Sequence, residues 1–208
     1  MISAGRYERT RYASPDQRLV DRLERQTVWR LLRGVPAKNL LDIPSGYGRF
    51  TSLLSSFGGR LVAGDRSLRA VMRCRERAGP GAAVFNVVSD AARLPFRGDT
   101  FDLVFCFRLF HHVPWSEAGR FLKELARVSR RWVLISCYVE TGAHRFLRRA
   151  QRRGSKIYFY RRREVLRLLS RAGLRVFAVS RPLPFFHAQT VFLLEKRGSG
   201  NSPVRTRL

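Results

Sequence analysis

The chain has 208 residues, 45% of them hydrophobic, which suits one globular domain with a substantial core. No apolar run approaches the roughly 20 residues that a helix needs to cross a bilayer, and the three widely spaced cysteines form no Cys-x-x-Cys pair. The composition therefore argues against a membrane-spanning protein, a disulfide-stabilised scaffold and a thiolate metal site, and it predicts a reducing, cytoplasmic setting.

The formal net charge of +26 is the most unusual bulk property of the chain. A field of that sign attracts phosphates, nucleic acids and anionic lipids. Two interpretations stay open: an arginine-rich soluble surface, or a surface that contacts RNA or an anionic membrane. On the second, the protein would lie peripherally at the inner membrane surface.

The first predicted element is a helix that begins after Ser14 and runs to about Arg33. Ser14 suits an N-cap and Pro15 suits the first turn, while Gly34 and Pro36 end the helical pattern. This helix is expected to cap the domain.

A short apolar run over 39–43 then breaks into a glycine-bearing turn. Leu40 and Leu41 indicate a buried parallel strand, and Gly46 and Gly48 allow the backbone to approach a ligand closely. The helix that follows is expected to direct free N–H groups at that ligand. A strand, turn and helix in this order are typical of a nucleotide-type pocket.

The second predicted strand ends in Asp65, nineteen residues after Gly46, about where such folds place an acid on a ribose diol. From there strands and helices alternate, which predicts a doubly wound α/β sheet. The predicted strands lie near 39–43, 60–64, 83–88, 101–107, 131–137, 174–180 and 188–195.

One domain is expected over 1–196, with a disordered basic tail over 197–208. Within the domain, the segment 1–38 forms the N-terminal cap region, and the segment 141–163 is a basic insertion predicted to cap the substrate site. The domain would therefore close over its ligands from two sides.

The basic insertion has a helical pattern of its own. Its arginines from Arg145 to Arg153 recur on one helical face, which indicates either a solvated face or a contact with phosphate or a membrane surface. Tyr158, Phe159 and Tyr160 follow as candidate stacking or interfacial groups.

Two later segments carry recognisable motifs. Asp90–Phe96 reads Asp-Ala-Ala-Arg-Leu-Pro-Phe, and Phe101–Val113 begins with Phe-Asp-Leu-Val and ends with Leu-Phe-His-His-Val. Following the glycine turn and Asp65, they make the chain resemble the class I S-adenosylmethionine-dependent methyltransferases. The resemblance runs from about Asn39 to Lys196 and is closest to the branch that includes ubiquinone and menaquinone biosynthesis methyltransferases.

The resemblance implies a Rossmann-like, doubly wound sheet of seven strands in the order 3-2-1-4-5-7-6, with strand 7 antiparallel. It also implies S-adenosylmethionine as the cofactor. This ligand joins a nucleoside to an amino acid through a cationic sulfonium and has no phosphate. Its site therefore needs acids rather than a phosphate cradle.

By the same resemblance, Gly46 and Gly48 would accommodate the methionine moiety, and Asp42 would hold its amino group. Asp65 would accept both ribose hydroxyls, and Asp90 would bind the adenine amino group. The full set of implied cofactor-binding residues is Asp42, Pro44, Ser45, Gly46, Gly48, Asp65, Arg66, Asp90, Ala91, Phe107 and Arg108.

Three members of this set have further implied contacts. Ala91 would lie against the adenine ring. Phe107 and Arg108, where the fourth strand ends, would flank the cofactor and face the substrate.

The sequence departs from the family pattern in two places. Pro44 stands where the first glycine of the turn is expected, and proline lacks a backbone N–H. Arg127–Trp132 occupies the position of the usual Gly-Gly before the fifth strand, which predicts a tighter or differently built turn. Thr51, where a dinucleotide fingerprint requires glycine or alanine, argues against a nicotinamide site.

His111 and His112 are the candidate acid–base residues, because a methyl acceptor can need to lose a proton near neutral pH. The alternative is that each packs or forms hydrogen bonds while proximity does most of the catalysis. His111 is slightly preferred. No metal is expected, because two adjacent histidines have no patterned Asp, Glu or Cys partner.

The leading hypothesis is an S-adenosylmethionine-dependent methyltransferase that acts on a small-molecule or lipid-linked acceptor. RNA methylation, on tRNA for example, is the second, favoured by the charge. The third is a non-catalytic, methyltransferase-like binding protein, for which Pro44 is the main motive.

Overall fold

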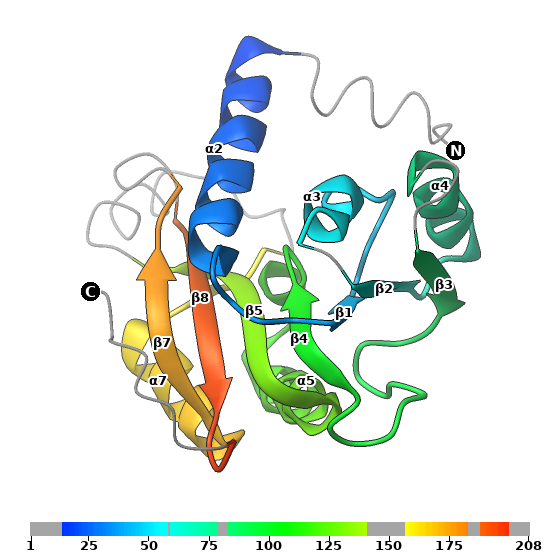
Figure 1. Ribbon diagram of the computed structural model, residues 1–208. Helices are drawn as coiled ribbons and strands as arrows, with labels where there is room; N and C mark the ends of the chain where they lie inside the picture. Colours follow the sequence, from blue (N-terminus) through cyan, green and yellow to red (C-terminus); the bar gives the residue numbers. More distant parts are fainter. Residues whose placement is uncertain (1–13, 58, 79–82, 141–156, 183–187, 200–208) are drawn as a thin grey trace.

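The computed structural model describes residues 14–57, 59–78, 83–140, 157–182 and 188–199. Its centre is one eight-stranded sheet in the order β3-β2-β1-β4-β5-β8-β7, with β6 paired to β5 outside that path (Figure 1). The strands are β1 (Asn39–Asp42), β2 (Arg60–Asp65), β3 (Val84–Val88), β4 (Phe101–Cys106), β5 (Ser129–Val139), β6 (Phe159–Tyr160), β7 (Leu174–Ser180) and β8 (Gln189–Lys196).

The directions of the strands confirm the predicted α/β topology. β1 pairs in parallel with β2 and β4, and β4 pairs in parallel with β5. β8 runs antiparallel to both β5 and β7, and its arrowhead points down in Figure 1 where those of β4 and β7 point up. With β6 left out, this is the predicted order 3-2-1-4-5-7-6 with the last strand reversed.

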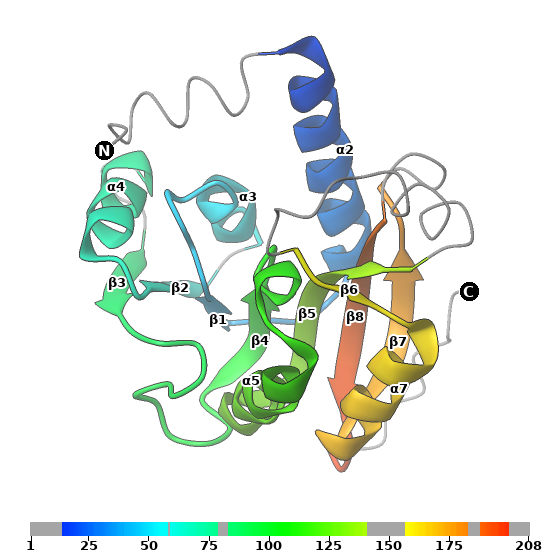
Figure 2. The ribbon, with the colours of Figure 1, turned by 180° about the vertical axis from the view of Figure 1, so that it is seen from behind.

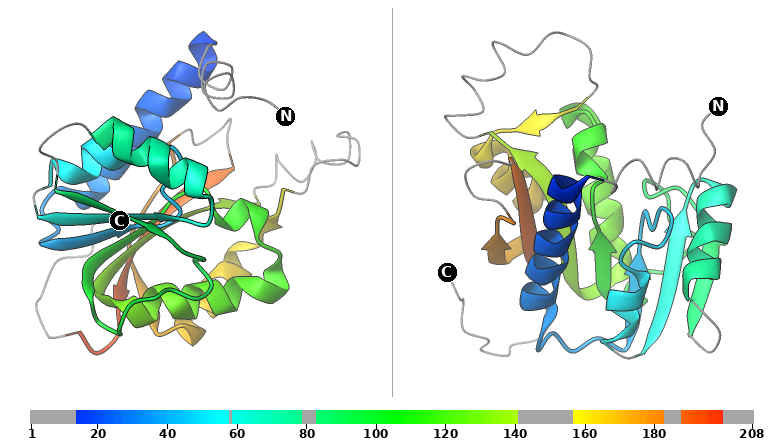
Figure 3. Two further views of the ribbon diagram at one scale, coloured as in Figure 1. Left: turned by 90° about the vertical axis from the view of Figure 1, so that its right-hand side faces the viewer. Right: turned by 90° about the horizontal axis from the view of Figure 1, so that it is seen from above.

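Helices cover both faces of the sheet. α2 (Pro15–Leu32), α3 (Thr51–Ser55) and α4 (Leu68–Ala78) lie on one face, and α5 (Trp115–Val128) and α7 (Arg162–Arg171) lie on the other. The left view of Figure 3 shows the two layers on either side of the sheet, and Figure 2 shows α5 and α7 from behind. The fold is therefore a three-layer α/β arrangement.

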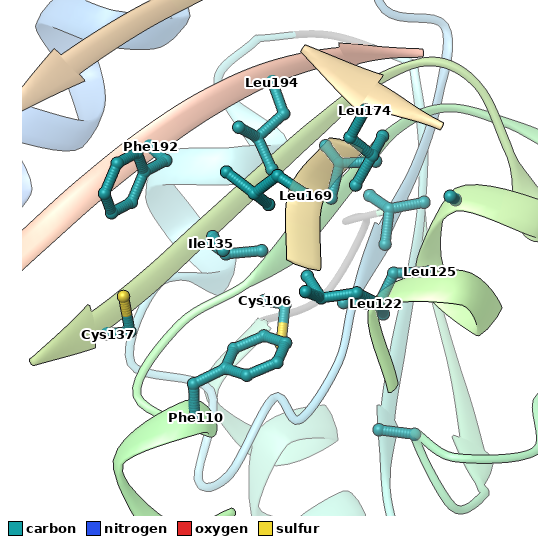
Figure 4. Close-up of a cluster of buried hydrophobic side chains, with 14 of the residues drawn as sticks. Cys106, Phe110, Leu122, Leu125, Ile135, Cys137, Leu169, Leu174, Phe192 and Leu194 are labelled. Carbon is teal, nitrogen blue, oxygen red and sulfur yellow. The ribbon is translucent and has the colours of Figure 1, made fainter. Parts of the chain in front are cut away.

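Each layer has its own hydrophobic core, because the strand residues alternate between the two faces. Leu40 and Leu103 face α2 and α3, whereas Leu41 and Val104 face α5. On that second face, α5 and α7 pack against Cys106, Ile135 and Phe192, which Figure 4 shows in close-up together with Leu122, Leu125, Leu169, Leu174 and Leu194. Both faces of the central strands are thus buried, as their continuous apolar runs predict.

Three local features differ from the sequence-based prediction. β6 was not predicted; it is a two-residue strand alongside the end of β5. Ser14 precedes α2, as expected, but its side chain makes no capping hydrogen bond. α5 ends at Val128 and β5 begins at Ser129, so no separate turn stands where Arg127–Trp132 replaces the usual glycines.

Several predicted features lie outside the described residues. These are the segment 1–13, residues 141–156 with the Arg145–Arg153 stripe, and residues 200–208 of the predicted tail. Among the helices in the described parts of the chain, none combines the length and apolar character that crossing a bilayer requires.

Candidate cofactor-binding site

The carboxyl ends of β1, β2 and β4 meet at one edge of the sheet, which is where open α/β sheets bind their ligands. Two adjoining cavities open along this edge, with volumes of about 400 and 660 Å³. Pro44, Asp65 and His112 line both. Together the cavities offer the size and the mixed polar and apolar lining of a small-molecule site.

The predicted cofactor residues divide between these two cavities, and one of them lines neither. The first cavity is lined by Asp42, Pro44, Ser45, Gly46, Asp65, Phe107 and Arg108, among others. The second is lined by Pro44, Asp65, Arg66, Asp90 and Ala91, among others. Gly48 is the exception.

Asp42, at the end of β1, is the most deeply buried of the predicted acids. It is 2% exposed, and its Oδ2 has no hydrogen-bond partner. Burial, and then the neighbouring charge of Asp65, raise the pKa of Asp42 well above its ordinary value. A buried carboxyl that lines a cavity in this way is suited to receive a cationic group.

The glycine turn is held by hydrogen bonds from its backbone N–H groups to the end of β2. Ser45 N donates to Gly64 O at 2.7 Å, and Gly46 N donates to Asp65 Oδ2 at 3.0 Å. Gly46 has φ +53°, in the left-handed region that favours glycine. The Ile43–Pro44 peptide is cis. The Gly46 N–H is therefore directed at a side chain, rather than left free for a ligand.

Gly48 is needed for packing. Its φ is +74°, and a Cβ at this position would stand 3.1 Å from Cα and Sγ of Cys74 in α4. The α3 helix that follows begins at Thr51 and has five residues. The close approach that the sequence indicated is thus between the turn and α4.

Asp65 and Asp90 lie at the ends of neighbouring strands. Asp65 accepts a second backbone hydrogen bond, from Ser67 N to Oδ1 at 2.9 Å. Asp90 is exposed, and its Oδ1 accepts from Ala92 N at 2.8 Å. The two carboxylates line the second cavity from turns that hold each in a fixed orientation.

The end of β4 contributes aromatic rings and a constrained backbone. Phe107 stacks on Phe105 with ring centroids 5.6 Å apart, and Phe50 lies 4.7 Å from Phe107. Arg108 has φ +59°, which is uncommon for a residue other than glycine. Its N–H donates to Ser136 Oγ at 2.8 Å, so β5 helps to hold this conformation.

Arg108 lines the first cavity, and its side chain also pairs with an acid. Its Nη2 lies 2.7 Å from Oε1 of Glu24 in α2, which is fully buried. Arg49 pairs with the other oxygen of Glu24. Glu24 is not among the site residues predicted from the sequence. The available signal was a charged residue on the same helical face as Val28 and Leu32, at positions that pack against the sheet.

The two histidines occupy different environments. His111 is 4% exposed, and its ring lies 4.9 Å from that of Tyr138 at an interplanar angle of 14°. His112 is exposed and lines both cavities. Of the two, His112 has access to a ligand at the sheet edge.

The histidine turn is fixed by β6. Tyr158 N donates to His111 O at 2.8 Å, and the hydroxyl of Tyr160 reaches Phe110 O at 2.8 Å and also contacts Val113 O. Tyr160 is 3% exposed, and burial raises its pKa above the ordinary value. Tyr160 therefore binds the backbone of the histidine turn through its buried hydroxyl, whereas the sequence indicated a stacking or interfacial group.

The described residues contain no group of three or more His, Cys, Asp or Glu side chains placed to hold a metal ion. Cys74, Cys106 and Cys137 are all buried thiols. Burial raises the pKa of Cys137 to about 12, which keeps it protonated at neutral pH. The described lining of the two cavities includes carboxylates, guanidinium groups, an imidazole and aromatic rings.

Part of the chain matches known proteins. Residues 41–135 match the family described as "Methyltransferase domain". A demethylmenaquinone methyltransferase of Mycobacterium marinum is 37% identical over 111 residues, and one of Mycobacterium tuberculosis is 34% identical over 110. The matched regions are 53% of this chain and 45% and 44% of those relatives, so the chain spans less than half their length.

A solved structure matches over more of the chain. The magnesium protoporphyrin IX methyltransferase of Synechocystis PCC 6803, crystallised with bound SAH, superposes with a TM-score of 0.75 over 88% of each chain, at 19% identity. At that identity the likeness concerns the fold. Residues 41–135 therefore match a methyltransferase domain, and the sheet around them has the strand order and directions of the class I S-adenosylmethionine-dependent methyltransferase fold.

Proposed function

We propose that this protein binds S-adenosylmethionine across its two cavities and transfers the methyl group to a small-molecule or lipid-linked acceptor. The observation that carries the proposal is the pair of acids at the carboxyl edge. Asp42 and Asp65 line the first cavity beside the rings of Phe50 and Phe107, and carboxylates with aromatic faces suit a cationic nucleoside.

In this proposal the residues have separate roles. Asp42 holds the ammonium group of the methionine moiety, and Asp65 accepts the ribose hydroxyls. Asp90 receives the adenine amino group, with Ala91, 7% exposed, against the ring. When bound, the cofactor supplies an electrophilic methyl group. The protein orients it, excludes water and accepts the acceptor's proton.

The acceptor class rests on two observations. The curated relatives are named for methylation of demethylmenaquinone, which is a small lipid-linked molecule. A row of rings formed by His112, His111, Tyr138 and Phe159, with successive centroids 4.0, 4.9 and 5.3 Å apart, leads away from the cavities. Of these rings, the partly exposed ones of Tyr138 and Phe159 suit stacking with a flat, apolar acceptor.

The direct test uses S-adenosylmethionine with a labelled methyl group and three acceptor pools from a cell extract: organic-soluble lipids, aqueous small molecules and RNA. Label in either of the first two pools supports the proposal. Transfer to RNA alone would establish the RNA alternative. Calorimetry showing no binding of S-adenosylmethionine would instead favour a non-catalytic binding protein.

The net charge of +26 suggests a peripheral contact of this enzyme with anionic lipid. Co-sedimentation with vesicles of phosphatidylglycerol and phosphatidylcholine tests it directly. Binding should weaken as salt rises from 0.05 to about 0.5 M, because the Debye length falls several-fold. Equal binding to pure phosphatidylcholine vesicles would remove the electrostatic contact from the proposal.

We expect His112→Gln to lower kcat by about 10² or more, the scale of a lost general base. The KM for S-adenosylmethionine should change by less than about threefold, because Asp42 and Asp65 hold the cofactor. His112→Gln should also remove the fall in rate on the acid side of the pH profile. His111→Gln is the matched control, which should lower thermal stability because His111 packs on Tyr138. An unchanged pH profile in His112→Gln would exclude it as the base.

A further inference from the structure

A cluster of charges joins α2 to two arginines that line the first cavity, Arg49 and Arg108. Glu24 accepts from Arg49, which follows the glycine turn, and from Arg108, which ends β4, through Nε at 3.1 Å and Nη2 at 2.7 Å. Asp21 adds contacts to Arg49 Nε at 2.6 Å and to Arg25 Nε at 2.9 Å. Segments far apart in the sequence are thus held on one helix (Figure 1).

The charged groups of this cluster are largely buried, so each of them needs a partner of opposite charge. The side chain of Glu24 is 0% exposed, and those of Arg49 and Arg108 are 14% and 20% exposed. A buried carboxylate requires charged partners with good geometry, and two guanidinium groups brought together repel unless an acid lies between them. Glu24 meets both requirements, because each of its oxygens has an arginine partner.

The charges of the cluster do not cancel. Three guanidinium groups, those of Arg25, Arg49 and Arg108, face the two carboxylates of Asp21 and Glu24, which leaves one positive charge. Arg49 and Arg108 both line the first cavity. Asp42 and Asp65 line the same cavity, so its lining includes both acidic and basic side chains.

We propose that Glu24 is a positioning residue, which holds Arg49 and Arg108 so that they bind the carboxylate of the cofactor's methionine moiety. The methionine moiety is zwitterionic, so its ammonium group needs an acidic partner and its carboxylate needs a basic one. Guanidinium groups bind carboxylates through paired hydrogen bonds, which depend on orientation. Glu24 itself does not touch the ligand. The inference rests on the proposed function, since it assigns part of the same ligand.

The experiment compares S-adenosylmethionine with decarboxylated S-adenosylmethionine, which lacks only the carboxylate, by calorimetry. The wild type should bind the complete cofactor about tenfold more tightly or better, the scale of a lost charge-assisted hydrogen bond. Glu24→Gln should weaken binding of the complete cofactor by about tenfold. Its affinity for the decarboxylated form should stay within about twofold of wild type.

Glu195→Gln is the matched control. Glu195 is 3% exposed and also bridges two arginines, with contacts of 3.0 Å to Arg131 Nε and 2.6 Å to Arg175 Nη2. In β8 it pairs with Trp132 near the start of β5, at the end of that strand opposite to its carboxyl end. This variant should lose thermal stability and keep the wild-type preference for the complete cofactor.

Three results would overturn the inference. In the first, the wild type binds S-adenosylmethionine and Glu24→Gln retains the full preference. In the second, Glu195→Gln abolishes the preference as well. In the third, Arg77→Gln alone abolishes the preference, which would assign the carboxylate to Arg77, another residue of that cavity.

If Glu24→Gln does not fold, Glu24→Asp withdraws the carboxylate by one methylene and serves the same comparison. A wild type that binds neither form would refute the proposed function itself.

Discussion

Asp65→Asn should weaken binding of S-adenosylmethionine by about 100-fold, because two charge-assisted hydrogen bonds to the ribose are lost or reduced. The amide also disturbs the turn. Asp65 accepts from Gly46 N and Ser67 N on its two oxygens, and an asparagine can accept on only one, so one N–H faces an NH2 group. Isothermal titration calorimetry gives the dissociation constant.

Asp102→Asn provides the control for this substitution. Asp102 also accepts backbone hydrogen bonds, from Lys38 N and Asn39 N, both at 2.9 Å to Oδ2. These contacts lie at the start of β1, away from the cavities. Asp102→Asn should therefore retain wild-type affinity. If Asp65→Asn bound the cofactor as well as Asp102→Asn, Asp65 would not be a ribose ligand.

Asp42→Asn should raise the stability of the fold while it weakens binding of S-adenosylmethionine. The substitution removes a buried, partly unsatisfied charge, so the free energy of unfolding should rise by about 1 kcal/mol at neutral pH. Binding of S-adenosylmethionine should weaken by about 10- to 100-fold, because the amide cannot pair with the ammonium group. Urea unfolding and calorimetry measure the two effects on the same preparation.

The effect on stability should depend on pH in a defined direction. Burial raises the pKa of Asp42 in the folded state, so the folded protein binds the proton more tightly than the unfolded chain. Stability from this group is then greatest below the ordinary Asp pKa and falls as pH rises toward the raised folded value. The advantage of Asp42→Asn should appear over that interval and stay constant above it.

The affinity for S-adenosylmethionine should change with pH in the opposite direction, and rise as pH rises toward the raised pKa of Asp42. A cation near Asp42 favours its ionised form, so binding below the raised pKa should release a proton. Calorimetry in two buffers with different ionisation enthalpies detects that proton, and Asp42→Asn should not release it. A variant that is less stable than wild type at every pH would contradict the assigned cost of burying Asp42.

Much of the fold could be predicted from the sequence. The apolar runs of β1 and β4 are continuous because both of their faces are buried. The turn residues between them set where each strand ends. The short strand β6 could not be predicted, because two residues carry no periodicity and Phe159–Tyr160 pairs only through the end of β5.

The site was predicted less completely than the fold. Asp42, Asp65 and Asp90 could be placed at strand ends, where parallel strands bring their carboxyl ends together. The sequence could not show that Gly48 contacts Cys74 or that only His112 of the two histidines lines the cavities. Both depend on how a turn is oriented against a neighbouring element.

The sequence by itself predicted most of the strands from local hydrophobic patterns. Motifs within single segments carried the resemblance that implied the order of those strands and the acids at their ends. Only the tertiary structure decided that Glu24 lies between Arg49 and Arg108. These three residues come from α2, the first turn and the end of β4, and no local pattern relates them. Their association follows from the packing of α2 over the sheet, which buries the carboxylate and makes its two cationic partners necessary.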